Sequence, residues 1–150
     1  IEQICKTQLG ERMGALCFII LYLSAMLVSI LPTYFKQKEN RSYHGLGASG
    51  AVSAMIFAYM LINPMHFMGI LFIPVMLPAF LFGIIFMLIS ISLDKKEQGG
   101  INHSAHITGG VYGFLYMIVL FYLLADIKLI ESFFRQIRID SLSDLFHLGF

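Results

Sequence analysis

One short segment decides the fold of this chain: GASGAVSA, residues 47–54. It opens an apolar run with small residues and places the hydroxyl of Ser49 among them. A counterpart, AHITGGVYG, occupies residues 105–113 and places His106 in a similar setting. The rest of the chain must explain how these two segments come side by side, and in which solvent.

The composition indicates lipid as that solvent. Hydrophobic residues make up 58% of the 150 residues, mean hydropathy is +0.80, and only 13% of the residues are charged. The charges are clustered, and long uncharged runs separate the clusters, as is typical of membrane proteins. The length fits a single domain. A formal net charge of +1 argues against a nucleic-acid partner.

The uncharged runs predict an all-α fold, a polytopic bundle with four transmembrane helices. The first contains a charge-free stretch long enough to cross about 30 Å of hydrocarbon, and Pro32 is expected to end it. Asn63-Pro64 is expected to close the second, because the residue before a proline avoids the helical region. The predicted spans are residues 13–35, 47–62, 76–92 and 103–125.

The apolar stretch between the second and third spans is interrupted by Pro74 and Pro78. Ile73 and Leu77 precede these prolines and are biased toward extended geometry. Residues 67–73 are therefore predicted to form an irregular segment near the membrane surface. One long kinked helix is the alternative.

The chain divides into a transmembrane domain, residues 1–125, and a tail, residues 126–150. In the tail, apolar residues recur at helical spacing, and Glu131 and Arg135 are four residues apart, which predicts an amphipathic helix on the membrane surface. A solvated tail is the alternative. The apolar positions are Ile127, Ile130, Phe134 and Ile137.

Four spans alternate in direction, so the second and fourth run parallel and start on the same membrane side. Ser49 and His106 then lie a few residues below that side. Gly109 and Gly113 form a GxxxG pair, and Gly50 with the alanine at 54 supplies a small face on the second span. Small faces let membrane helices pack closely.

Charge does not orient the bundle, because each membrane side carries five Lys or Arg residues. Cys5 and Cys17 follow no disulfide pattern and are expected to be free thiols. The chain starts at Ile1 with no signal-peptide pattern, which suggests a processed protein or part of a longer one.

Ser49 and His106 together suggest acyl transfer. A serine is a weak nucleophile until a base takes its proton, and histidine can accept that proton and return it to a leaving amine. No Asp or Glu lies near either residue to orient the imidazole, so a dyad is predicted rather than a triad. A polar pair that holds two helices together is the alternative. His103 and His106 have no third metal ligand, so neither metal nor cofactor is predicted.

Both motifs resemble those of the rhomboid family of intramembrane serine proteases. GASG at residues 47–50 is similar to the family's GxSG motif, and AHITGGVYG at 105–113 to its AHxxGxxxG motif. The proline-containing run at 73–83 also resembles the family segment between them. The resemblance covers residues 2–123, and the two motifs in this order are specific.

The resemblance implies a six-helix core with Ser49 as nucleophile and His106 as general base. Backbone groups of Gly47, Ser49 and Gly50 would support the oxyanion, and Gly109 and Gly113 would serve helix packing. It also implies a transmembrane protein substrate, lipid surroundings and a multi-pass location in the bacterial cytoplasmic membrane with a cytoplasmic tail. The third span would be the substrate gate.

The chain departs from the family pattern in two ways. Its four spans look like the last four of six, so the family's oxyanion-binding His and Asn have no match here. Ser53 stands where some members place a tyrosine that stacks on the histidine, and Tyr112 is a candidate for that role. A non-catalytic relative that binds transmembrane segments is the competing hypothesis. The substrate and oligomeric state do not follow from the sequence.

Overall fold

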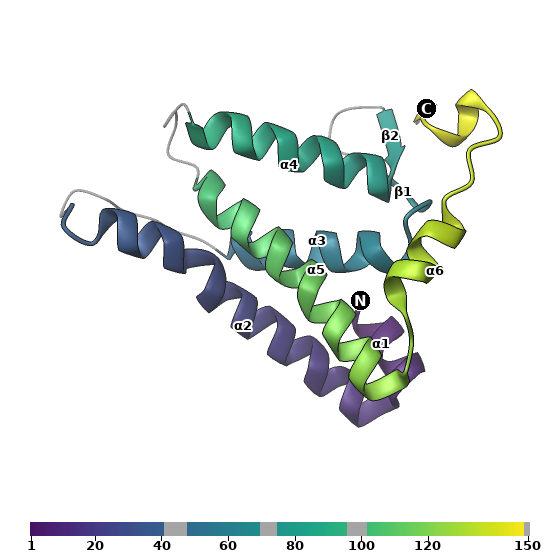
Figure 1. Cartoon of the computed structure of the whole chain (residues 1–150), viewed down its shortest axis with the longest axis horizontal. Coiled ribbons are helices and arrows are strands. Elements are labelled where there is room, and N and C mark those ends of the chain that lie inside the picture. Colours follow the sequence, from purple (N-terminus) through teal and green to yellow (C-terminus); the bar gives the residue numbers. More distant parts are fainter. Residues whose placement is uncertain (41–47, 70–74, 96–101, 149–150) are drawn as a thin grey trace.

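The computed structural model describes residues 1–40, 48–69, 75–95 and 102–148, and it is mainly helical (Figure 1). The helices are α1 (Glu2–Leu9), α2 (Glu11–Gln37), α3 (Ser49–Ile62), α4 (Ala79–Lys95), α5 (His103–Ala125) and α6 (Leu129–Gln136). The short elements are strands β1 (Phe67–Gly69), β2 (Val75–Pro78) and β3 (His147–Leu148) and the 3₁₀ turn η1 (Leu142–Asp144).

Two helices, α2 and α5, are long and apolar enough to cross a membrane, and α3 and residues 79–94 of α4 are shorter apolar helices. At about 1.5 Å per residue, the 27 residues of α2 span about 40 Å and the 14 residues of α3 only about 21 Å. The four apolar helices coincide with the four predicted spans, except that α4 begins at Ala79 instead of Met76, because residues 75–78 form β2.

The side chains of α2 are arranged for a lipid solvent. Large apolar residues point outward, such as Leu27 at 69% exposure, while mostly small ones face the bundle. Close backbone approach at small residues is how helices associate where lipid tails are as apolar as leucine. The buried positions recur every three or four residues: Gly14, Cys17, Leu21, Ala25, Ser29 and Thr33.

Helix α5 is the centre of the bundle. It packs against α2, α3, α4 and α6, and α3 is its most extensive neighbour. In Figure 1, α5 crosses in front of α3 and runs beside α2, while α4 lies on the other side. Met117 and Phe121 of α5 are almost fully buried and join Leu21 and Leu61 in the main apolar core.

One predicted helix end and one predicted irregular segment are wrong. Pro32 does not end the first span, because α2 continues through it to Gln37. A proline removes one hydrogen bond, and a membrane helix tolerates that loss. Residues 67–69 are neither irregular nor helical: β1 pairs antiparallel with β2, with Met68 opposite Leu77. Leu77 is extended as predicted, and Ile73 lies outside the described residues.

The tail forms a helix that packs partly on the bundle. Leu129 of α6 is buried in the main core, whereas Ile130 and Phe134 are exposed. The predicted pair forms, with Arg135 Nη2 3.4 Å from Glu131 Oε2. Beyond α6, β3 pairs antiparallel with β2.

Both cysteines are free and buried. Burial raises the pKa of the Cys5 thiol, with Cys17 adding to the shift. The predicted free thiols are confirmed, and the raised pKa makes Cys5 a poor nucleophile.

Asn102 ties the end of α2 to the start of α5. Its side-chain oxygen accepts a hydrogen bond from Ala105 N at 3.0 Å, which caps α5, and another from Thr33 Oγ1 at 2.8 Å. Thr33 is only 6% exposed, so its hydroxyl depends on this partner.

We expect Asn102→Ala to lower the free energy of unfolding by about 1–2 kcal/mol, since a cap is lost and a buried hydroxyl is left unpaired. Asn102→Asp retains the acceptor and serves as the control. Thermal unfolding in detergent measures both variants. An alanine variant as stable as the wild type would show that neither bond contributes.

Candidate functional site

Ser49 is the first residue of α3 and is half-buried. Its carbonyl oxygen accepts a hydrogen bond from Ser53 Oγ at 3.1 Å, and Ser53 is 1% exposed. No side chain among the described residues caps the start of α3. The first amides of a helix have no partner within it, so this end of α3 can bind negative charge. Gly47, predicted to contribute there, lies outside the described residues.

Helices α3 and α5 approach at backbone level through their glycines. A Cβ added at Gly109 would overlap the carbonyl oxygen of Gly50 and lie 2.7 Å from its carbonyl carbon. One turn further along both helices, a Cβ at Gly113 would lie 2.6 Å from the Cα of Ala54. The two contacts advance in the same direction, so the helices run parallel. The predicted small-residue contact is confirmed.

Gly50 is enclosed from two sides. A Cβ there would overlap Ser29 of α2 and lie 3.0 Å from the carbonyl oxygen of Ala105. Ser29 is itself buried, and its hydroxyl donates to Met26 O at 3.2 Å. Ser49 directly precedes Gly50, and His106 directly follows Ala105. The segments that carry Ser49 and His106 are therefore neighbours, as the topology predicted.

Within the described residues, no hydrogen bond joins the Ser49 hydroxyl to the His106 ring; the Ser49 contact that is formed is made by its carbonyl oxygen. Hydrogen bonds between catalytic groups are often long or unformed before substrate binds. The segments that contain Ser49 and His106 are in backbone contact, and a hydrogen bond between the two side chains requires a further movement.

Two rings surround the half-buried imidazole of His106. The Phe86 ring of α4 lies at a centroid distance of 5.7 Å with an interplanar angle of 33°. The His103 ring lies at the same distance with an angle of 88°. His103 Nδ1 is buried and has no hydrogen-bond partner among the residues that the structure describes. The sequence did not single out Phe86, because nothing in its spacing relates it to residue 106.

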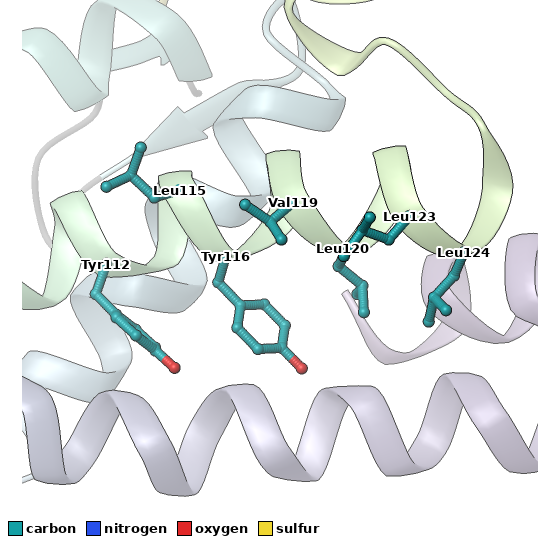
Figure 2. A pocket seen from close by; sticks show the side chains of 7 residues that line it. All are labelled: Tyr112, Leu115, Tyr116, Val119, Leu120, Leu123 and Leu124. Carbon is teal, nitrogen blue, oxygen red and sulfur yellow. The ribbon is translucent and has the colours of Figure 1, made fainter.

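Tyr112 is not the aromatic partner of His106, contrary to the prediction. Its hydroxyl donates to Ser24 Oγ at 2.7 Å, and its ring lies 6.0 Å from that of Tyr116. The Tyr116 hydroxyl also donates a hydrogen bond to α2, to the carbonyl oxygen of Cys17 at 3.1 Å. Figure 2 shows both tyrosines reaching from α5 toward α2. Residue 112 follows His106 by six positions. At about 100° per residue this is one full turn plus about 240°, so Tyr112 faces a different neighbour from His106.

An apolar hollow lies beside the two tyrosines and is lined entirely by residues of α5 (Figure 2). Besides the two tyrosines its lining is leucine and valine, and both tyrosine hydroxyls donate to α2, at Ser24 Oγ and Cys17 O. The described part of the chain contains no cluster of three His, Cys, Asp or Glu side chains that could hold a metal ion.

Comparison with known proteins identifies the family of this chain. Residues 4–123 match the Rhomboid domain family, so the chain belongs to that family. No curated protein and no solved structure is significantly similar to it. The match includes all of α2 to α4, most of α5, and both segments that carry Ser49 and His106.

Proposed function

We propose that this rhomboid family member is an intramembrane serine endopeptidase in which Ser49 is the nucleophile and His106 the general base. The observation that supports this most is the backbone contact of Gly50 with Ala105 and Gly109. Through this contact the turn of Ser49 lies next to the turn of His106, and membership in the Rhomboid domain family supports the proposal of serine-protease chemistry at this pair.

In the proposed reaction, Ser49 Oγ attacks the carbonyl carbon of the scissile peptide bond while His106 accepts the hydroxyl proton. The C–N bond then breaks, and His106 returns the proton to the leaving amine. Water attacks the resulting ester with His106 again as base, which releases the acid and restores Ser49. Backbone amides at the start of α3, including those of Ser49 and Gly50, would stabilise the oxyanion.

The short length of α3 supports a site below the membrane surface. At about 21 Å, α3 falls short of a hydrocarbon core of about 30 Å, whereas α2 and α5 do not. Ser49, at the end of this short helix, would then be recessed and reached by water from its own membrane side. A transmembrane protein that enters sideways from the lipid is the substrate class that fits. The protein is proposed to be multi-pass, in a bacterial cytoplasmic membrane.

Among the described residues Ser49 and His106 share no hydrogen bond, and this favours a second candidate, a non-catalytic relative that binds transmembrane segments. A fluorophosphonate probe distinguishes the two on full-length protein in proteoliposomes. We expect covalent labelling that peptide mapping assigns to Ser49. A folded protein that binds a transmembrane peptide but takes up no probe would support the second candidate and overturn the first.

A further inference from the structure

The His106 imidazole needs a partner that fixes its orientation. A general base must direct one ring nitrogen at the serine hydroxyl, and in many hydrolases a carboxylate on the other nitrogen fixes the ring. No hydrogen bond to the His106 ring is formed among the described residues. The contacts that the ring does make are with Phe86 and His103.

The two rings restrict His106 in different directions. The Phe86 ring is tilted by 33° from the imidazole plane, with the two ring centroids 5.7 Å apart. The His103 ring stands at 88°, in an edge-to-face arrangement. Rotation of the imidazole about its χ2 bond would disturb both contacts, and aromatic pairs have preferred geometries.

Phe86 is itself held firmly. Phe82, one turn earlier on α4, stacks on it at 6.3 Å with an angle of 14°. Phe57 of α3 contacts it at 6.3 Å with an angle of 58°. Phe57 in turn fits against Gly110, where a Cβ would lie 2.8 Å from its Cδ2 atom. Phe86 thus links α3, α4 and α5 and cannot reorient independently of them.

We propose that Phe86 is the positioning residue for His106 and fixes the plane of the imidazole in place of a carboxylate. This inference rests on the proposed function. It makes α4 part of the catalytic arrangement: a displacement of α4 away from α5 removes the Phe86 ring contact and releases the histidine.

The kinetic test compares Phe86→Leu, Phe86→Tyr and Phe80→Leu in full-length protein. Phe80 is the matched control, because it lies on the same helix and packs in the same apolar cluster, whereas the ring contacts of His106 among the described residues are with Phe86 and His103. We expect kcat for a transmembrane substrate to fall about tenfold in Phe86→Leu with KM unchanged, because one aromatic contact orients the base and none binds substrate. Phe86→Tyr restores the ring and should restore kcat.

A Phe86→Leu kcat within about threefold of wild type overturns the proposal. So does an equal loss in Phe80→Leu, because general packing of α4 would then explain it. A leucine variant with the same thermal unfolding as the control excludes misfolding as the cause.

A second readout does not require protease activity. With ring-¹³C histidine, the His106 resonance, assigned by its loss in His106→Gln, senses the ring current of Phe86. We expect it to shift in Phe86→Leu and not in Phe80→Leu; an unchanged resonance overturns the proposed contact. A wild-type protein that takes up no fluorophosphonate probe would instead overturn the proposed function. Failure of the Phe86 proposal and failure of the proposed function are therefore distinguishable.

Discussion

Replacing Ser49 by alanine is expected to abolish cleavage of a transmembrane substrate and all fluorophosphonate labelling. The alanine keeps the small-residue start of α3 and leaves the Gly50–Gly109 contact intact, so the fold should persist. Removing a nucleophile that acts together with its base costs a factor on the order of 10⁶ in kcat in other serine proteases. The remaining rate should therefore fall below detection in a gel-based cleavage assay.

Ser53→Ala is the matched control, because Ser53 lies one turn further along α3 and its hydroxyl donates to the Ser49 carbonyl oxygen. That variant should cleave and take up probe at nearly the wild-type rate. Labelling that persists in Ser49→Ala and disappears in Ser53→Ala would place the nucleophile at Ser53 and contradict the proposed site.

Gly109→Val is expected to lower the free energy of unfolding by about 3 kcal/mol or more, because its Cβ would overlap backbone rather than a movable side chain. To accommodate the valine side chain, α3 and α5 must separate near the turns that contain Ser49 and His106. Activity should be lost with the stability. Unfolding by SDS in mixed micelles measures the stability, and cleavage measures the activity.

The control for this variant is Val111→Ile, which adds a methylene on the same helix at a side chain that is 47% exposed. It should unfold as the wild type does. If Gly109→Val were equally stable, α3 and α5 would not be in backbone contact, and the geometry on which the proposed function depends would be wrong.

The bundle could be predicted from the sequence because its determinants are local. Uncharged runs mark the apolar helices, and the fourth predicted span coincides with α5. The parallel contact of α3 and α5 followed from counting spans and from the small residues at 50, 54, 109 and 113. Ser49 and His106 needed no more than this to become neighbours.

What the sequence missed depends on tertiary neighbours. The strands β1 and β2 are short and apolar, and such runs have no period that separates strand from helix. Pro32 carries a helix-breaking signal that the surrounding bundle overrides. Phe86 is one of many phenylalanines, and only the packing of α4 on α5 selects it. Asn102 is followed by a second polar residue, His103. Which of them caps α5 depends on the position of Thr33 in the folded bundle.

The contact between α3 and α5 joins segments that a ribosome makes at different times. Residues 49–54 are synthesised before α5, so the face formed by Gly50 and Ala54 has no α5 partner until residues 105–113 follow. On the proposed mechanism, Ser49 remains without its base until residues 105–113 have been inserted beside it. On that mechanism, a nascent chain interrupted before that point would be inert as a protease.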